Sequence, residues 1–346
     1  MALWLVRAGR AGEYESKFLE EGKIYLTWES LSEDLSKFKE KRNLYDFLLT
    51  KYSEEKPAAV RNWTSQIWPI AKDMKKGDWV VLPSKKKSAI HFAEIIGDYV
   101  NLSDGPDPFF HYREVKWFAT NIPRSNFEQD ILYSLGAFMT ICRITRNDAE
   151  KRIKEMANNN WKVPSVSSQV PLKKEEIKEE EIITLTDLEQ FAKDQIAKFI
   201  IRKFKGHGMA ELIEAILKAQ GYTTFRSPQG PDRGIDILAS PGPLGFGTPR
   251  ICVQVKSSDS PVDRPTLDQL IGAMQNVNAD QGLLVSWSGF KTTVDKEVPN
   301  QFFRVRIWDQ DAIIDELVKN YEKLPDDLKA ELPLKRVWTL ATTEID

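Results

Sequence analysis

Two short segments between residues 234 and 256 carry side chains that together could act on a phosphodiester. The first holds Asp236 between two isoleucines, and the second places Gln254 and Lys256 two residues apart. Both segments are rich in β-branched residues and are bounded by turn formers, which predicts two short strands. Side chains alternate between the two faces of a strand, so Gln254 and Lys256 share a face. If the strands pair as a hairpin, a carboxylate, an amide and an ammonium converge there.

This set of groups fits metal-assisted hydrolysis. Mg2+ takes oxygen ligands, and Asp236, the side-chain carbonyl of Gln254 and the backbone carbonyl of Val255 could supply them. The bound cation would polarise the phosphate and lower the pKa of a bound water. Lys256 could orient that water or stabilise the negative charge that develops in the reaction. We therefore expect Mg2+ as the cofactor, with Mn2+ as an alternative.

A helix upstream could add a second carboxylate. Residues 209–220 have apolar residues at helical spacing, and Gly221 follows them as a stop signal. Glu211 lies near the start of this expected helix. The order of the helix and the two strands favours a hydrolytic site over a simpler interpretation. In that interpretation Gln254 and Lys256 form the solvent face of an edge strand, and Asp236 lies in a turn.

These segments resemble the catalytic domain of Mrr-type restriction endonucleases, which belong to the PD-(D/E)XK nuclease superfamily. The resemblance rests on Ala-Glu-Leu-Ile-Glu-Ala-Ile-Leu-Lys-Ala-Gln-Gly-Tyr (210–222), Gly-Pro-Asp-Arg-Gly-Ile-Asp-Ile-Leu-Ala (230–239), Val-Gln-Val-Lys (253–256) and Gln-Gly-Leu-Leu-Val-Ser-Trp-Ser-Gly-Phe (281–290). It implies that Glu211 is the helix acid, that Asp236 binds the metal and that Lys256 is the catalytic lysine. It also implies that Gln254 stands in the place of the second acid. Glutamine there departs from the general superfamily pattern and leaves only two carboxylates.

The composition of the chain indicates several parts. A Ser- and Pro-containing stretch followed by a charge-rich run marks residues 164–183 as a linker. Residues 184–321 then form the expected nuclease domain, and residues 322–346, with two prolines and an apolar end, suggest an extended arm. In the nuclease domain we expect helices near 184–204, 264–276 and 312–321, and strands near 282–287 and 303–308. Together these elements predict an α/β sandwich with a mixed sheet.

Residues 1–163 form the other expected domain. Short strands with turn signals near 4–9, 23–28, 76–83, 89–100 and 112–119 predict a small β-barrel, accompanied by helices. The order of elements is similar to the EVE-like members of the PUA/YTH-type fold. The similarity rests on the runs at 4–9, 22–28, 66–68, 77–81 and 96–99. It implies an aromatic pocket that holds a flipped, modified base of DNA.

Three tryptophans are candidates for the walls of such a pocket. Trp28 ends an expected strand and Trp68 precedes a proline, and Trp63 lies nearby in the sequence. Stacking on aromatic rings would offset the cost of extruding a base, which is a few kcal/mol. The alternative is that these rings are part of the core. The run Lys85–Lys87 could contact DNA phosphates, although a lysine-rich turn is more often only solvated.

The overall composition limits the partners and the compartment. The chain has 49 basic and 51 acidic residues, so affinity for nucleic acid would come from local basic patches rather than from net charge. Cys142 and Cys252 are far apart, and the three histidines show no zinc spacing, so we expect a reducing compartment and a carboxylate-bound metal. No apolar run reaches the length of a membrane span. These features predict a cytoplasmic protein.

The sequence thus predicts a Mg2+-dependent DNA endonuclease that responds to base modification. Its N-terminal domain would read the modified base, and its C-terminal domain would cut. A double-strand break requires two active sites, so a homodimer on double-stranded DNA is expected. Two alternatives stay open: a repair or structure-specific nuclease, and a DNA-binding protein whose active site has decayed.

Overall fold

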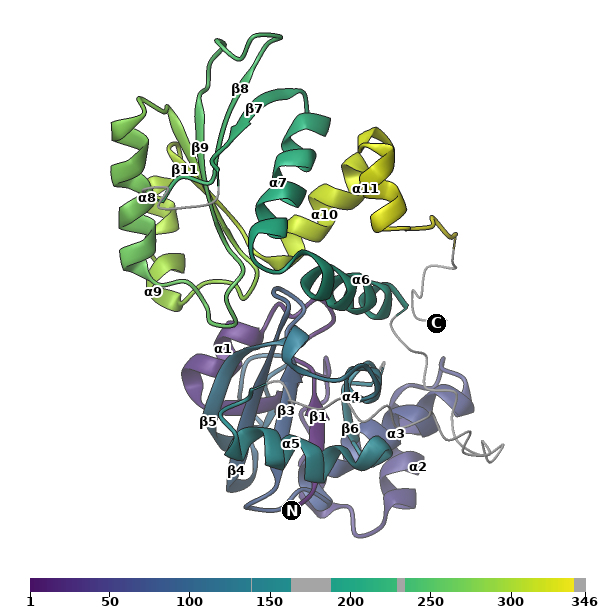
Figure 1. The fold of residues 1–346 in the computed structure, drawn as a ribbon. Coiled ribbons are helices and arrows are strands. Elements are labelled where there is room, and N and C mark those ends of the chain that lie inside the picture. Colours follow the sequence, from purple (N-terminus) through teal and green to yellow (C-terminus); the bar gives the residue numbers. More distant parts are fainter. Residues whose placement is uncertain (138, 163–187, 229–233, 339–346) are drawn as a thin grey trace. The chain divides into compact units, whose positions relative to one another are not determined.

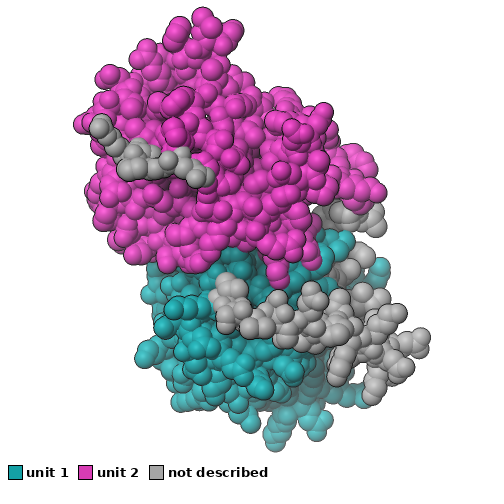
Figure 2. Space-filling view, in the orientation of Figure 1, with its two compact units in different colours: residues 1–191 teal, residues 192–346 magenta. Residues whose placement is uncertain are grey.

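The computed structural model describes residues 1–137, 139–162, 188–228 and 234–338. The chain divides into two compact units, residues 1–191 and 192–346 (Figures 1 and 2). The linker expected at 164–183 lies outside the described residues. Among the helices of the described residues, none combines the length and the apolar character that a membrane span requires.

The first unit contains a six-stranded mixed sheet in the order β2-β5-β4-β3-β1-β6 (Figure 1). Strand β1 runs parallel to β3, and the other neighbours are antiparallel. The strands are β1 (Leu3–Val6), β2 (Lys23–Leu26), β3 (Trp79–Pro83), β4 (Ala89–Asn101), β5 (His111–Pro123) and β6 (Ile141–Arg143).

Helices cover both faces of this sheet. One core contains residues of α2, α3 and the Trp4 and Val6 side of β1, and the other contains residues of α4, α5 and the Leu3 and Leu5 side. The helices and short 3-10 turns of the unit are α1 (Glu15–Glu21), η1 (Leu35–Lys37), α2 (Lys41–Lys51), α3 (Pro57–Lys72), η2 (Arg124–Asn126), α4 (Gln129–Ser134), η3 (Arg146–Asp148) and α5 (Ala149–Asn158).

The prediction of a small closed barrel is therefore wrong. In the part of the chain that the structure describes, the terminal strands β2 and β6 of the sheet do not pair with each other, and the sheet stays open. The physical reason is visible in β1, where all four residues are buried. A strand that is apolar on both faces needs a packed layer on each side, and the helices provide those layers.

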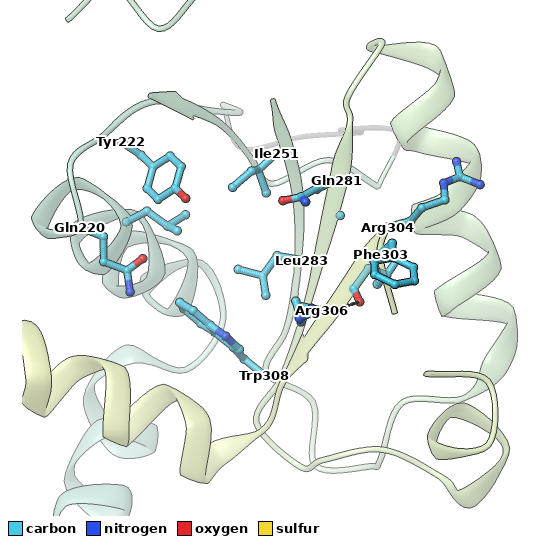
Figure 3. A pocket seen from close by; sticks show the side chains of 12 residues that line it. Gln220, Tyr222, Ile251, Gln281, Leu283, Phe303, Arg304, Arg306 and Trp308 are labelled. Atoms are coloured by element: carbon cyan, nitrogen blue, oxygen red, sulfur yellow. Dashed lines mark hydrogen bonds between the residues drawn. The ribbon is translucent and has the colours of Figure 1, made fainter. Parts of the chain in front are cut away.

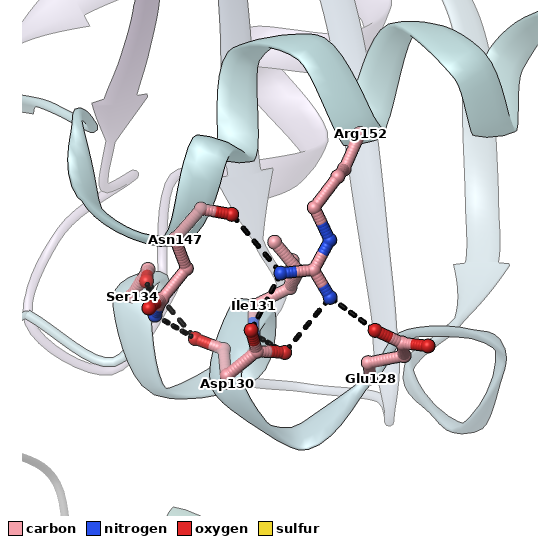
Figure 4. Close-up of polar contacts among 6 residues, drawn as sticks. All are labelled: Glu128, Asp130, Ile131, Ser134, Asn147 and Arg152. Carbon is pink, nitrogen blue, oxygen red and sulfur yellow. Dashed lines mark hydrogen bonds and ion pairs between the residues drawn. The ribbon is translucent and has the colours of Figure 1, made fainter. Parts of the chain in front are cut away.

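Ion pairs and hydrogen bonds join α5 to the start of α4. The guanidinium of Arg152 on α5 bonds both carboxylate oxygens of Asp130, at 2.5 and 2.9 Å, and also bonds Glu128 (Figure 4). Burial opposes ionisation of Asp130, but the bonds from Arg152 outweigh it, so the pKa of this carboxyl is lowered. Bidentate pairing of this kind fixes orientation as well as adding energy.

The second unit is a five-stranded sheet in the order β11-β10-β9-β8-β7 (Figure 1). Strands β9, β10 and β11 are parallel, and β7, β8 and β9 are antiparallel. The strands are β7 (Tyr222–Arg226), β8 (Ile237–Pro241), β9 (Ile251–Lys256), β10 (Gln281–Ser286) and β11 (Val305–Trp308). The prediction of a mixed sheet is confirmed, although β7 was not among the expected strands.

Helices again lie on both faces of the sheet. Residues of α6, α7 and α10 share one core with Val253 of β9, and residues of α8 share the other with Cys252. The helices and short 3-10 turns are α6 (Leu188–Phe204), α7 (His207–Ala219), α8 (Arg264–Asn276), α9 (Thr292–Asp295), η4 (Val298–Gln301), α10 (Gln310–Asn320), η5 (Tyr321–Lys323) and α11 (Asp326–Glu331). The expected layered sandwich is thus present in this unit.

The segment after α10 differs from the extended arm that its prolines suggested. It contains the short helix α11, and Leu324 and Leu332 on either side of that helix are buried in the core of the unit. The hydroxyl of Tyr321 donates to the backbone carbonyl of Leu332 at 2.7 Å. The segment therefore packs against its own unit as far as Leu334, whose backbone N–H donates to the same hydroxyl.

Candidate functional site

Strand β9 lies in the middle of the five-stranded sheet, between β8 and β10. Gln254 is only 1% exposed, and Cys252 on the same face is fully buried. The simpler interpretation, in which Gln254 lies on the solvent face of an edge strand, is therefore wrong. Burial, with the nearby charge of Asp236 as the second cause, raises the pKa of the Cys252 thiol to about 11, so this cysteine is not a ready nucleophile.

Asp236 lies directly before β8 and is held against the end of β9. Its Oδ2 accepts a hydrogen bond from the backbone N–H of Val255 at 2.7 Å. Its own N–H donates to the carbonyl of Val253 at 2.9 Å. Asp236 therefore bonds the residue between Gln254 and Lys256, so the structure brings these three predicted site residues together.

The side-chain oxygen of Gln254 has an unusual environment. It is buried, and it finds no hydrogen-bond partner among the residues that the structure describes. An unsatisfied buried oxygen costs about 1–3 kcal/mol. The polypeptide approaches Gln254 closely at Gly234, which has a φ of +81° and where an added Cβ would lie 3.1 Å from the amide nitrogen. Glycine suits this position because its φ is in the left-handed region, and a Cβ would also require the Gln254 amide to shift by a few tenths of an ångström.

These oxygens fit a hard cation. A buried amide oxygen on Gln254 and a carboxylate on Asp236, which bonds the next residue Val255, are donor types that Mg2+ accepts, and the backbone carbonyl of Val255 follows Gln254 in the sequence. The described residues contain no group of three or more His, Cys, Asp or Glu side chains that could bind a metal. A cation here would therefore depend on Asp236, on Gln254 and on backbone oxygen.

Lys256 is the last residue of β9 and is half-buried. No hydrogen bond or ion pair joins its ammonium to another residue in the described ranges. The next residue, Ser257, accepts a hydrogen bond at 2.8 Å from the backbone N–H of Gly206, which precedes α7. The end of β9 and the start of α7 therefore lie side by side.

Glu211 lies on α7, as expected, but its carboxylate is not free. It is 53% exposed and pairs with the guanidinium of Arg226 on β7 at 2.8 Å. Arg226 also bonds the ring of His207, at 3.0 Å. Sequence reasoning missed Arg226, because no motif marks an arginine at the end of a short Thr-rich strand.

One cavity of the second unit lies at the opposite end of β9 from this site. A cavity of about 210 Å3 is lined by residues of α7, β7, β9, β10 and β11, among them Tyr222, Leu283 and Trp308 (Figure 3). Ile251 and Gln281, the first residues of the parallel strands β9 and β10, also line it. Lys256 lies at the opposite, carboxyl end of β9, which is the end where open α/β sheets bind ligands.

In the first unit, two of the three predicted pocket tryptophans meet. The rings of Trp28 and Trp63 are 5.7 Å apart and edge to face, and Tyr52 packs against Trp63 at 5.5 Å. Trp68 makes no ring contact with either of them among the described residues, and its indole N–H donates to Asp73 at 3.1 Å. Trp63 and Trp68 are five positions apart on α3, so the two rings leave the helix in different directions.

The three lysines Lys85, Lys86 and Lys87 lie in the turn between β3 and β4 and are exposed. The backbone N–H groups of Lys86 and Lys87 donate to the buried hydroxyl of Ser84, at 3.1 and 3.0 Å. The turn is thus anchored to the unit, and its side chains face solvent.

Two family models match parts of the chain. Residues 201–317 match the family described as "Restriction endonuclease". Residues 4–143 match a family described as a domain of unknown function (DUF8426), so the EVE-like resemblance of this part is not confirmed. No curated protein matches the chain.

Two solved structures are similar at low identity. The DNA modification-dependent restriction endonuclease AspBHI is 12% identical, with 90% of this chain and 79% of that chain covered and a TM-score of 0.33. The MspJI restriction endonuclease, in complex with a 27-mer oligonucleotide, is 13% identical, with 96% and 80% covered and a TM-score of 0.32. The family match covers 117 of the 346 residues, about a third of the chain, and supports a nuclease.

Proposed function

We propose that the protein is a Mg2+-dependent DNA endonuclease of the Mrr type that cuts DNA carrying a modified base. The observation that supports the proposal is the hydrogen bond that holds Asp236 against Val255, the residue between Gln254 and Lys256, at the carboxyl end of β9 within the residues that match the restriction endonuclease family. Asp236 contributes a carboxylate, Gln254 a buried oxygen without a described partner, and Lys256 an ammonium without one. These are the groups that phosphodiester hydrolysis requires at such a site.

The roles of the residues follow from their environments. Asp236, Gln254 and the carbonyl of Val255 would hold the cation, which when bound polarises the phosphate and lowers the pKa of water. Lys256 acts on the charge that develops at the phosphate, because its ammonium is half-buried and not neutralised by a described neighbour. Glu211, paired with Arg226, supplies a further negative charge that would strengthen binding of the cation without being one of these three ligands.

A cleavage panel tests the proposal. Plasmids carrying 5-methylcytosine, 5-hydroxymethylcytosine, N6-methyladenine or no modification are incubated with the protein and Mg2+. We expect cutting of at least one modified plasmid in preference to the unmodified one, loss of cutting with a chelator, and recovery with Mn2+. If no plasmid is cut under any of these conditions, the protein is instead a DNA-binding protein with a decayed site. Preferential cutting of flaps or junctions identifies a structure-specific nuclease.

The burial of Gln254 leads to a testable prediction. In Gln254→Glu, a carboxylate replaces a side chain that is 1% exposed, so without metal the free energy of unfolding should fall by about 3 kcal/mol or more. Millimolar Mg2+ should restore much of this loss, because the added charge binds the cation in the native state only. Melting temperatures with and without Mg2+ measure both effects.

The matched control is Gln281→Glu, which adds the same charge at an exposed position on the neighbouring strand β10. Its melting temperature should change little, and Mg2+ should not alter that change. A Gln254→Glu protein whose stability is insensitive to Mg2+ would contradict the assignment of Gln254 to the cation.

The aromatic cluster in the first unit is our proposal for the modified-base site. Trp28, Trp63 and Tyr52 are half-buried, and the rings of Trp28 and Tyr52 both contact Trp63, which supports a role in stacking on an extruded base. Removal of Trp28 or Trp63 by alanine should reduce cleavage of the modified plasmid roughly tenfold to a hundredfold. Cleavage of an unmodified plasmid at high enzyme concentration should be unchanged.

Trp68→Ala is the control, because Trp68 lies on the same helix as Trp63 but outside the cluster. It should retain the preference for modified DNA. An equal loss of preference in all three variants would indicate a structural effect on α3 rather than contact with a base.

The exposed lysines at 85–87 are proposed contacts to the DNA backbone. We also propose that a homodimer forms on DNA to cut both strands.

A further inference from the structure

One face of α7 carries a row of polar side chains that meets the end of β7. His207, Glu211 and Glu214 lie four and three residues apart, which places them along one side of a helix. Arg226, the last residue of β7, contacts all three: Nη1 bonds Glu211 at 2.8 Å and His207 at 3.0 Å, and Nε bonds Glu214 at 3.0 Å. The opposite side of α7 is apolar and packs into the core of the unit.

Glu214 anchors this arrangement. Its side chain is only 13% exposed, and it accepts hydrogen bonds from Thr224 at 2.8 Å and from Arg226, while Lys218 pairs with it at 2.9 Å. Burial opposes ionisation of Glu214, but the bonds from Lys218 and Thr224 outweigh it, so the pKa is lowered. A charged, fully bonded carboxylate therefore fixes the plane of the Arg226 guanidinium, because the Nε of arginine is rigidly linked to its Nη atoms.

The backbone places Arg226 next to the candidate site. In the β7–β8 ladder Arg226 stands opposite Ile237, the neighbour of Asp236. The backbone N–H of Ser227, the residue after Arg226, donates to the carbonyl of Asp236 at 2.9 Å. Arg226 therefore joins Glu211 on α7 to the backbone beside Asp236, the residue directly before β8.

We propose that Arg226 is a positioning residue that holds the carboxylate of Glu211 at the Asp236 end of the sheet. This inference rests on the proposed function, and it explains how the conformation of the Glu211 side chain is fixed at the site. Glu211 is half exposed, and Arg226 is its partner in the described ranges. Without that partner the flexible glutamate would sample many rotamers in water. The guanidinium is already bonded by three side chains, which favours positioning over direct binding of a DNA phosphate.

The test uses Arg226→Gln, Arg226→Lys, Glu211→Gln and the double variant Glu211→Gln/Arg226→Gln in the full chain. We measure two values: the Mg2+ concentration that gives half-maximal cleavage, and the calorimetric dissociation constant of Mn2+ in the cleavage-deficient Lys256→Ala background. Positioning predicts that each single variant raises both values by about tenfold, and that the double variant adds little to either single one. Arg226→Lys should resemble Arg226→Gln, because lysine cannot bond Glu214 and Glu211 in a fixed fork.

Arg306→Gln is the control, since Arg306 lies on β11 at the opposite edge of the sheet and should leave both values unchanged. Two results would overturn the inference: additive effects of the two single substitutions, or a wild-type metal response in Arg226→Lys. Weaker metal-free DNA binding by Arg226→Gln, with a normal Mn2+ response, would make Arg226 a phosphate contact and would also overturn it. Failure of the wild-type protein to cut any DNA overturns the proposed function instead.

Discussion

Replacement of Lys256 by alanine is expected to reduce the cleavage rate by roughly a hundredfold to a thousandfold, the usual effect of removing one group that stabilises transition-state charge. The ammonium has no partner among the described residues, so its removal breaks no interaction that supports the fold. The melting temperature and the metal-free affinity for DNA should therefore stay close to those of the wild-type protein. Quenched-flow or gel-based cleavage rates on the susceptible plasmid, with circular dichroism for stability, measure these quantities.

The control for this variant is Lys319→Ala on α10, where the lysine is 66% exposed and pairs with Glu316 at 2.7 Å. It removes the same charge from the same unit, and cleavage should be unaffected. Undiminished cutting by Lys256→Ala would remove Lys256 from the site. A comparable loss in both variants would mean that net charge, and not the position of the lysine, controls the reaction.

Replacement of Asp236 by asparagine is expected to lower cleavage by about a thousandfold, or ~4 kcal/mol in the activation free energy. An asparagine oxygen can still accept the hydrogen bond from the Val255 N–H, so the end of β9 should keep its geometry. The loss therefore reports the missing negative charge. Mn2+ titration by calorimetry should show a correspondingly weaker affinity.

Asp280→Asn provides a closely matched control. Asp280 also accepts a backbone hydrogen bond at 2.7 Å, from the N–H of Arg250 at the beginning of β9. The substitution removes the same negative charge at the other end of the same strand, so cleavage and Mn2+ affinity should be retained. If Asp236→Asn cut DNA at the wild-type rate, the carboxylate could not be a ligand of the reacting centre.

Much of the second unit could be predicted from local patterns. The β-branched run at 251–256 and the apolar spacing at 264–276 have strong periodicity, and β9 and α8 occupy those residues. Strand β7 was missed because it is short and carries Thr-Thr and Arg, with partly exposed residues along its whole length. In the first unit the structure contains most of the predicted strands, but they form an open sheet and not the predicted barrel. Closure depends on which strands pair, and strand patterns alone do not specify that.

The environment of the site was less predictable than its residues. The alternation in Ile-Cys-Val-Gln-Val-Lys placed Gln254 and Lys256 on one polar face, but it did not predict that Gln254 is almost fully buried. The close approach of Gly234 to its amide depends on tertiary structure, which periodicity does not report. The same holds for Arg226: its contacts with three residues of α7 arise from the packing of β7 against α7, which spacing along the chain does not predict.

Anomalous diffraction from crystals of the protein grown with Mn2+ tests the central claim most directly. We predict a manganese peak in contact with the carboxylate of Asp236 and the side-chain oxygen of Gln254, with Lys256 beside it and unligated. A peak bound by other side chains, with the Gln254 oxygen still buried and unbonded, would contradict the account.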